Sequence, residues 1–339
     1  MVGDRVISRD LLQIKDLSIQ FKTFFGTAKA VRNLDLSIGH GEVLGLVGES
    51  GCGKSITARA VMGLLKSPPA IIPEGRILYR EKQIFPGDPE VMRRIRGKEI
   101  SMIFQEPMTS LNPVFRVGKQ VVEVMQAHNY GDRDSLRERA IGLFKAVGIP
   151  EPEKRLDAYP HQLSGGLRQR VMISMALACK PGLLIADEPT TALDVTIQAQ
   201  ILDIILKMRA EYGMAVMIIT HDLGVISQLA DRVNVMYAGK IVEDAPVGEI
   251  LASPAHPYTK GLIASIPDIE IPHSRDFRLN ALRGVVPELY EIPPGCPFSN
   301  RCPDVFDECN LIDPSLEEIS SEHRVACLLY SRKKRSEDS

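Results

Sequence analysis

The segment of residues 48–55, GESGCGKS, constrains the fold of this chain more than any other part of the sequence. It matches the pattern G-x-x-x-x-G-K-[ST], follows the apolar stretch of residues 41–47 and precedes residues 55–65, whose apolar side chains recur at helical spacing. Glycines let successive backbone N–H groups turn toward one point, and the start of a helix adds positive potential there. The sequence therefore predicts a strand, a phosphate-binding loop and a helix.

Two residues of this loop are expected to carry most of its chemistry. Lys54 would bring a mobile positive charge to the β- and γ-phosphates of a nucleotide, and Ser55 would ligate Mg²⁺. A glycine-rich turn with an incidental lysine is the alternative interpretation of such a segment taken alone. The other residues expected to surround the phosphates are Gly48, Glu49, Ser50, Gly51, Cys52 and Gly53.

A pair of carboxylates follows the uncharged run of residues 182–186. A buried strand could carry Asp187 and Glu188 to the sheet edge that holds the phosphates, where Asp187 would suit Mg²⁺ and Glu188 the attacking water. On its own, such a pair is more often a helix cap or part of a solvated loop. Its combination with the phosphate-binding loop favours a nucleotide site.

A second anion-binding segment, LSGGL, lies between these two motifs at residues 163–167. The turn formed by Ser164, Gly165 and Gly166 opens a predicted helix, and its N–H groups offer further donors to an anion. One chain therefore contains two predicted phosphate-binding helix starts.

Other segments indicate the elements around these motifs. Apolar and polar residues alternate over residues 12–21 and 31–38, which indicates strands, and residues 214–220 form a further apolar strand. Residues 116–180 look mainly helical. This order fits helices inserted between two parts of one sheet.

Taken in this order, the segments GESGCGKS, LSGGLRQR and LIADEPTTALD resemble the Walker A, signature and Walker B plus D-loop sequences of ATP-binding cassette (ABC) ATPases. The resemblance covers residues 10–250. It implies an α/β P-loop NTPase with a RecA-like core, an antiparallel β subdomain and an α-helical subdomain inserted at about residues 106–165. It also implies that the chain binds ATP and Mg²⁺ and hydrolyses ATP.

The same resemblance assigns roles to three residues that would attract no attention alone. Gln105 matches the Q-loop, which would contact Mg²⁺ and the hydrolysis site, Asp194 matches the D-loop, and His221 matches the switch histidine. Gln105 and His221 would then act in catalysis with Glu188. The signature usually ends in glutamine, whereas this chain has Leu167 there, a departure that bears on signalling rather than on the use of ATP.

An aromatic side chain often stacks on adenine in this family, and Phe21 occupies the corresponding region. Phe24 and Phe25 are close enough in sequence to take that place instead. A phenylalanine of the protein core is the remaining interpretation of Phe21, and the sequence leaves these alternatives open.

Composition and hydropathy exclude several classes of protein. The 41 basic and 43 acidic residues of this 339-residue chain nearly cancel, so no nucleic-acid partner is expected. The N-terminus, MVGDRVISRD, is charged where a signal peptide needs its apolar stretch, and no uninterrupted apolar run of about 18 residues occurs. We therefore expect a chain that is neither secreted nor membrane-spanning.

Three further segments, at residues 104–113, 256–267 and 295–309, resemble the ATPases of oligopeptide and dipeptide importers. That group implies a peripheral subunit on the cytoplasmic face of the cell membrane, bound to two transmembrane permease subunits and paired with an identical or homologous second ATPase. An extracytoplasmic binding protein would deliver the solute. Importers of nickel, glutathione and oligosaccharides share the group, so the sequence leaves the transported solute open.

Four of the six cysteines lie in a proline-rich region, residues 251–330, that follows the ATPase segment. Their separations of six, seven and eighteen residues lack the CxxC knuckle of most structural zinc sites. The resemblance points to a [4Fe–4S] cluster, with Zn²⁺ or free thiols as the alternatives. The polar tail, residues 331–339, is expected to be disordered. The four cysteines are Cys296, Cys302, Cys309 and Cys327.

Three rival functions fit the sequence less well. A soluble ABC ATPase acting on ribosomes or DNA repair would typically show two fused cassettes or a long coiled-coil insertion, and neither is present. A regulatory subunit that only binds nucleotide would lack the carboxylate of Glu188. An exporter half would carry membrane-spanning helices, which this chain does not. Import of a solute is therefore the preferred interpretation.

Overall fold

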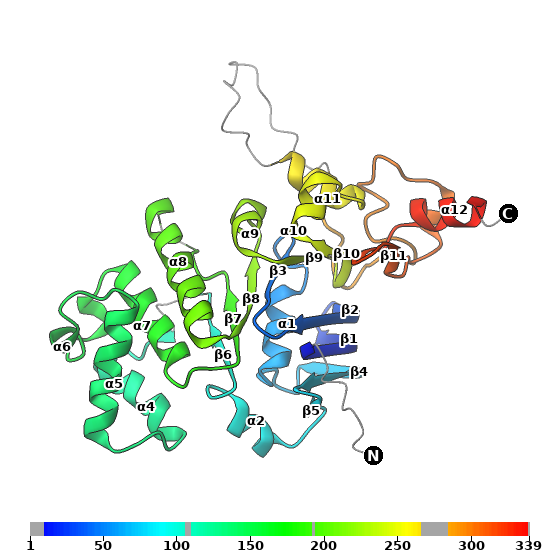
Figure 1. The fold of residues 1–339 in the computed structure, drawn as a ribbon. Helices are drawn as coiled ribbons and strands as arrows, with labels where there is room; N and C mark the ends of the chain where they lie inside the picture. The colour runs from blue at the N-terminus through cyan, green and yellow to red at the C-terminus, as the bar shows by residue number, and fades with distance from the viewer. Residues whose placement is uncertain (1–9, 106–109, 192–193, 266–283, 338–339) are drawn as a thin grey trace, which may run out of the picture.

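The computed structural model describes residues 10–105, 110–191, 194–265 and 284–337, and these residues fold around two β-sheets (Figure 1). The larger sheet has the strand order β11-β12-β10-β9-β3-β8-β7-β6. Its neighbours from β6 to β9 pair in parallel, and those from β9 to β11 pair antiparallel. The strands are β3 (Val43–Val47), β6 (Ile100–Ile103), β7 (Leu183–Asp187), β8 (Ala215–Thr220), β9 (Arg232–Tyr237), β10 (Lys240–Pro246), β11 (Glu317–Ser320) and β12 (His323–Val325).

The middle of this sheet is buried on both faces. Every residue of β3, β7 and β8 is buried. Strands covered on both faces read as continuous apolar runs rather than as alternating ones, which is the pattern of these three segments. The apolar runs predicted over residues 41–47, 182–186 and 214–220 therefore lie side by side, in the order β3-β8-β7.

The smaller sheet is antiparallel, with the order β2-β1-β4-β5. The alternation of residues 12–21 lies in β1, whose Leu12 and Ile14 pair with Ile38 and Leu36 of β2 and are buried with them. One face of the sheet thus contributes to a core that also covers the large sheet and helix α1. The strands are β1 (Asp10–Thr23), β2 (Gly26–Gly39), β4 (Ala70–Tyr79) and β5 (Lys82–Phe85).

A group of helices is inserted between β6 and β7, as the sequence predicts. Figure 1 shows these helices, in green, together at one end of the molecule. Helices α4, α5 and α7 pack against one another around apolar side chains such as Val121, Leu136, Phe144 and Val171. The inserted helices are α4 (Val117–Ala127), α5 (Arg133–Ala146), α6 (Pro152–Arg155), the 3₁₀ turn η1 (Pro160–Gln162) and α7 (Gly165–Leu177).

The C-terminal region extends the large sheet instead of forming a separate appendage. Strand β12 pairs with β10, and β11 pairs with β12. Helix α12 runs to Glu337, so residues 331–337 are helical where the sequence analysis predicts disorder. The remaining helices are α1 (Lys54–Val61), α2 (Pro89–Ile95), α8 (Val195–Tyr212), α9 (Leu223–Leu229), α10 (Val247–Ala252), α11 (Pro257–Ala264), η2 (Asp307–Asn310) and α12 (Leu328–Glu337).

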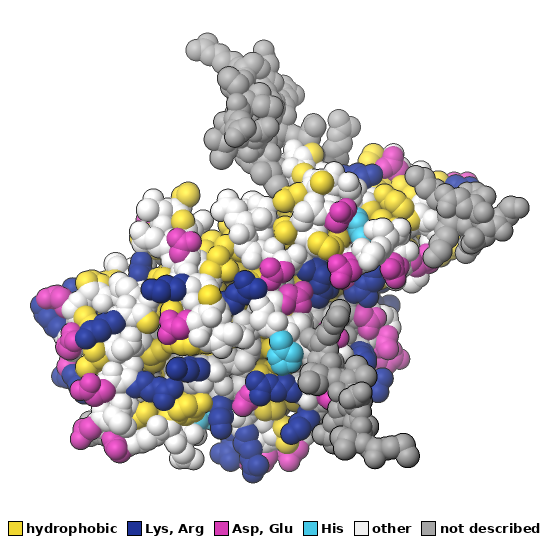
Figure 2. Space-filling model, viewed as in Figure 1, with side chains coloured by type: hydrophobic (Ala, Val, Ile, Leu, Met, Phe, Trp, Pro, Cys, Tyr) yellow, Lys and Arg dark blue, Asp and Glu magenta, His cyan; other side chains and the backbone are white. Residues whose placement is uncertain are grey.

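The surface carries charges of both signs. Figure 2 shows Lys and Arg side chains interspersed with Asp and Glu over one face of the molecule, in keeping with a formal net charge of −2. Within the described part of the chain, no helix combines the length and the apolar character that crossing a membrane requires.

A buried carboxylate joins the C-terminal strands to the rest of the large sheet. Glu243, on β10, is fully buried and accepts hydrogen bonds from the backbone N–H groups of Ala255 and His256 at 2.6 and 2.9 Å. Its other contact is with Nε2 of His323 on β12, at 2.9 Å. One side chain thus satisfies three polar groups that the fold removes from water.

We expect Glu243→Ala to lower the free energy of unfolding by about 3 kcal/mol, because it leaves two N–H groups and an imidazole buried without an acceptor. Urea unfolding followed by circular dichroism measures the change. Glu249→Ala, at an exposed position of α10, is the matched control and should leave the midpoint nearly unchanged. Equal midpoints for the two variants would contradict the role given to Glu243.

Candidate active site

The loop between β3 and α1 is tightly packed, and two of its glycines are required by their surroundings. Gly48 has φ +155°, and a Cβ there would lie 2.1 Å from the carbonyl oxygen of Met236. Gly53 has φ +111°, and its Cβ would lie 2.5 Å from the carbonyl oxygen of Ala30. Any side chain at either position would push the loop off the sheet. Glycine is therefore required at both positions for the loop to pack against these carbonyl groups.

Lys54 is folded over this loop. Its Nζ donates to the carbonyl oxygens of Gly48 and Glu49 at 2.6 and 3.0 Å, and its side chain is buried. Cys52, also buried, has its sulfur 3.6 Å from the same Nζ. The ammonium thus lies within the turn whose N–H groups and helix start attract anions.

Ser55 and Asp187 meet at the start of α1. The hydroxyl Oγ of Ser55 donates to Oδ1 of Asp187 at 2.9 Å, although 132 positions separate them in the sequence. Burial raises the pKa of the Asp187 carboxyl, the hydrogen bond from Ser55 opposes that effect, and the neighbouring charge of Glu188 adds to it. A hydroxyl and a carboxylate are the oxygen ligands that Mg²⁺ takes in proteins, so this pair fits the ion.

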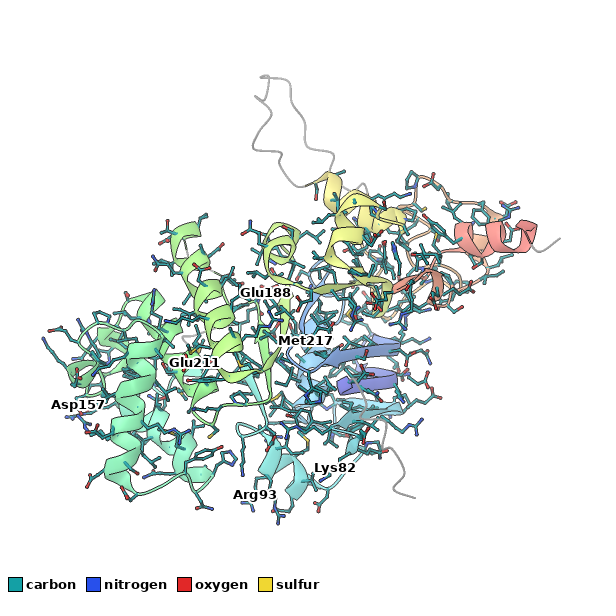
Figure 3. All side chains as sticks on the ribbon, viewed as in Figure 1. Lys82, Arg93, Asp157, Glu188, Glu211 and Met217 are labelled. Atoms are coloured by element: carbon teal, nitrogen blue, oxygen red, sulfur yellow. The ribbon has the colours of Figure 1, made fainter. Side chains whose placement is uncertain are left out.

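Glu188 is the centre of a hydrogen-bonded cluster at the end of β7, in the middle of the molecule (Figure 3). Gln105 Nε2 and Thr191 Oγ1 donate to its Oε2 at 2.8 and 2.9 Å, and Nδ1 of His221 lies 3.3 Å from its Oε1. Burial alone would raise the pKa of Glu188, but hydrogen bonds from Thr191 and His221 outweigh it and lower the pKa. The carboxylate is therefore charged and able to accept a proton.

Backbone geometry also sets the direction of this carboxylate. Glu188 has φ +45°, a left-handed conformation that is uncommon for a residue with a side chain, and its N–H donates to the carbonyl oxygen of Ile219 at 2.9 Å. Strained residues of this kind persist where the surrounding structure fixes them. Thr191, which helps to fix Glu188, is missing from the sequence-based site, although its position three residues later in the same motif was the available signal.

Gln105 and Glu188 line a pocket of about 140 Å³ together with residues of the phosphate-binding loop. Leu289 also lines the pocket, and no sequence signal marks it, because the C-terminal region around it shows no periodicity. The carbonyl oxygen of Leu289 accepts from the N–H of Lys29 on β2 at 2.8 Å, which attaches this segment to the small sheet. The pocket is lined by Ala30, Ser50, Gly51, Gly53, Lys54, Ser55, Ile56, Gln105, Glu188 and Leu289.

The signature residues lie outside this pocket. Ser164 caps α7, where its Oγ accepts from the N–H of Leu167 at 3.4 Å, and Gly165 and Gly166 form the first turn of that helix. Asp194 caps α8 and accepts from the N–H of Ile197 at 3.1 Å. None of these four predicted nucleotide-binding residues is among those that line the pocket of Lys54.

The predicted adenine platform is also outside the pocket lining. Phe21 is half-buried and packs against the core beneath the small sheet. Phe25 is 78% exposed and stacks on Tyr290 of the C-terminal region, with ring centroids 6.4 Å apart. Phe24 is 98% exposed. Of the three phenylalanines, Phe25 is therefore the one with an aromatic partner from the segment that carries Leu289.

The four C-terminal cysteines converge on one small cavity, of about 10 Å³, beside α11 and α12. Burial raises the pKa of Cys296 and of Cys327 to about 11, and that of Cys302 is also raised by burial. Within the part of the chain that the structure describes, no group of three or more His, Cys, Asp or Glu side chains is placed to hold a metal ion. The cysteines that line the cavity are Cys296, Cys302, Cys309 and Cys327.

The fold and the pocket together define the class. A phosphate-binding loop between β3 and α1, a hydroxyl–carboxylate pair suited to Mg²⁺ and a charged glutamate beside them are the parts of a P-loop ATPase.

Comparison with known proteins gives the family. Residues 31–191 match the model of the ABC transporter family, and residues 242–309 match that of the oligopeptide/dipeptide transporter C-terminal region. The chain is 46% identical to a dipeptide transport ATP-binding protein of Bacillus subtilis, over 95% of this chain and 96% of that protein. It is 48% identical to an oligopeptide transport ATP-binding protein of the same organism, over 93% and 87% of the two chains.

Solved structures agree with this assignment. A dimeric ATP-binding cassette in a post-hydrolysis state, bound to ADP and Pi, matches with a TM-score of 0.63 and 27% identity, over 70% of this chain and 98% of that one. CbiO1 of Clostridium perfringens, part of an ABC transporter complex, matches with a TM-score of 0.61 and 29% identity, over 73% and 92%. The chain belongs to the ATP-binding proteins of ABC transporters, in the group with the oligopeptide/dipeptide transporter C-terminal region.

Proposed function

We propose that this chain hydrolyses ATP to drive the import of dipeptides or oligopeptides through partner permeases. Two contacts beside the loop, Ser55 with Asp187 and Gln105 with Glu188, support this proposal. The relatives, similar over nearly their whole length, are named as dipeptide and oligopeptide transport ATP-binding proteins. Those names favour peptides over nickel, glutathione or oligosaccharides as the solute. They also favour transport over the work of a soluble ABC ATPase.

The geometry suggests a division of labour within the pocket. Lys54 and the N–H groups of the loop would bind the phosphates of ATP, and Ser55 and Asp187 would hold Mg²⁺, which neutralises phosphate charge when bound. Glu188 would orient and deprotonate the attacking water, and His221 and Gln105 hold its carboxylate in place. Gln105 donates to Glu188 through Nε2, so its Oε1 is the atom that would contact Mg²⁺.

A second ATPase subunit would complete the site. Ser164 and Asp194 lie outside the pocket of Lys54, and the N–H groups at the start of α7 form an anion site of their own. The similar cassette bound to ADP and Pi is a dimer. We therefore place Ser164, Gly165 and Gly166 of one subunit against the phosphates held by the loop of the other, with Asp194 at the same interface.

The inserted helices offer a surface for the permease. A groove of about 710 Å³ is lined by Val114 and Phe115, which are 70% and 39% exposed, and by Arg116, Arg137 and Asp157. Figure 3 shows Asp157 in the inserted helices, well away from Glu188. This surface suits a permease segment on the cytoplasmic face of the membrane, with two permeases for two subunits and an extracytoplasmic binding protein beyond them.

We propose a [4Fe–4S] cluster at the four cysteines, with Zn²⁺ or free thiols as the alternatives. Four thiols from separate turns of the chain line one cavity, and four thiolates are the ligand set of such a cluster. The cluster would supply positive charge to thiols that burial otherwise keeps protonated, and would hold this proline-rich segment together.

We expect Glu188→Gln to keep ATP affinity while lowering hydrolysis by about two to four orders of magnitude, the range for loss of a positioned base. In cells, this variant should abolish uptake of a labelled dipeptide or tripeptide and leave nickel uptake unchanged. Glu249→Gln, at an exposed position, is the control for both assays. If the Glu188→Gln variant took up peptide at the normal rate but lost nickel uptake, nickel rather than a peptide would be the solute.

Mixing two inactive variants tests the two-subunit site. Ser164→Arg blocks the signature, and Lys54→Ala disables the loop, so each homodimer has two damaged sites. A heterodimer has one intact site, formed by the loop of the Ser164→Arg chain and the signature of the Lys54→Ala chain. The mixture should regain ATPase activity that neither variant shows alone, and a mixture no more active than its components would argue for a site within one chain.

Protein purified without oxygen should be brown and contain about four irons and four sulfides per chain. Cys302→Ser should lose the colour and lower the melting temperature of the C-terminal region, while Cys179→Ser, at a buried cysteine outside the cavity, should keep the full iron content. One zinc per colourless chain would select the zinc alternative, and metal-free protein would leave the cysteines as thiols.

A further inference from the structure

An arginine of the C-terminal region pairs with a carboxylate of the phosphate-binding loop. Arg301 lies 252 positions after Glu49 in the sequence, and its Nη1 and Nη2 donate to the two carboxylate oxygens of Glu49 at 2.7 and 3.0 Å. The Arg301 side chain is only 3% exposed, whereas that of Glu49 is 29% exposed. A two-point arginine–carboxylate pair of this kind fixes direction as well as distance.

Two tyrosines take part in the same contact: one binds the loop and the other binds Arg301. The hydroxyl of Tyr258, on α11, accepts from the N–H of Glu49 at 2.8 Å, and the hydroxyl of Tyr237, on β9, lies 3.3 Å from Nη1 of Arg301. The rings of Tyr237 and Tyr258 pack with Phe298, with centroids 4.7 to 5.5 Å apart. The Arg301 side chain thus packs against this aromatic cluster and extends from it to Glu49 of the loop.

The position of Glu49 makes this pairing relevant to the nucleotide. Glu49 is the second residue of the loop that receives phosphate groups, so an unpaired carboxylate there would repel them. Its carbonyl oxygen also accepts from Nζ of Lys54 at 3.0 Å, which ties the same residue to the cation that binds the phosphates. Arg301 can therefore affect ATP binding in two ways: it neutralises the Glu49 carboxylate, and it fixes the position of the Glu49 backbone.

We propose that Arg301 is a positioning residue for ATP binding: it neutralises Glu49 and fixes the first turn of the phosphate-binding loop. Through Arg301, the C-terminal region affects how tightly the loop binds ATP, although the N–H groups and the lysine that bind the phosphates all belong to the ATPase segment. Arg301 directly precedes Cys302, one of the residues that line the cysteine cavity, so that cavity and the loop are joined by two adjacent residues. The inference rests on the proposed function, in which this loop binds ATP.

Two variants, one without Arg301 and one without both Arg301 and the charge of Glu49, distinguish an effect on ATP binding from a loss of packing. We expect Arg301→Met to weaken ATP binding by the purified full chain about tenfold, as one unpaired carboxylate in the loop would. The double variant Arg301→Met with Glu49→Gln should recover most of that loss, because no charge then repels the phosphates. Arg301→Lys, which keeps the charge but not the two-point contact, should fall between Arg301→Met and the unaltered chain.

Steady-state hydrolysis gives an independent measurement. The KM for ATP of Arg301→Met should rise by the same factor as its dissociation constant, while kcat changes less than about twofold, because Glu188 and its partners are untouched. Arg93→Met is the matched control: it removes an exposed arginine paired with Glu90, at the edge of the molecule far from Glu188 (Figure 3), and should change neither constant.

Three results would overturn the proposal. Unchanged ATP affinity in a folded Arg301→Met protein would show that the pair does not act on the nucleotide. Equal losses in Arg301→Met and in the double variant would show that Arg301 only holds the C-terminal region in place. If the unaltered chain binds no ATP in the same titration, the proposed ATPase function fails as well, and this outcome is distinct from the other two.

Discussion

The proposed hydrolysis site depends on the parallel order of three buried strands. Strands β3, β8 and β7 are neighbours and run in the same direction, so their C-terminal ends meet at one edge of the sheet. The phosphate-binding loop follows β3, His221 follows β8, and Glu188 follows β7. The loop and Glu188, more than a hundred positions apart, therefore line one pocket, and His221 contacts Glu188. Ligands of open α/β sheets bind at such an edge for the same reason.

Sequence reasoning was most successful where chemistry is local. The backbone explains why glycines stand at positions 48 and 53. Both residues have positive φ values, and both lie close to a carbonyl oxygen, that of Met236 for Gly48 and that of Ala30 for Gly53. The apolar runs that predicted β3, β7 and β8 follow from burial on both faces. The contact between Ser55 and Asp187 could also be anticipated, since Asp187 ends β7 and Ser55 lies just beyond the loop that follows β3 of the same sheet.

The features that sequence reasoning missed depend on contacts between distant segments. No periodicity marks Leu289 or Arg301, because both lie in irregular backbone whose shape is set by the segments it packs against. Strands β11 and β12 are short and polar, and they become strands only because β10 offers an open edge. The sequence leaves Phe21 open between stacking on adenine and packing in the core; the Phe21 side chain packs against the core, and Phe25 stacks on Tyr290.

The pairing of β12 with β10 removes any clean boundary between the ATPase segment and the C-terminal region. A chain ending near residue 250 would expose the edge of β10, together with the buried carboxylates of Glu243 and Asp244, and unpaired strand edges invite association between molecules. Asp244 itself accepts from Arg232 on one side and Arg324 on the other. The cysteine-bearing region is therefore joined to the ATPase segment through a shared sheet and buried carboxylates, and cutting the chain between them would expose polar groups that the fold now buries.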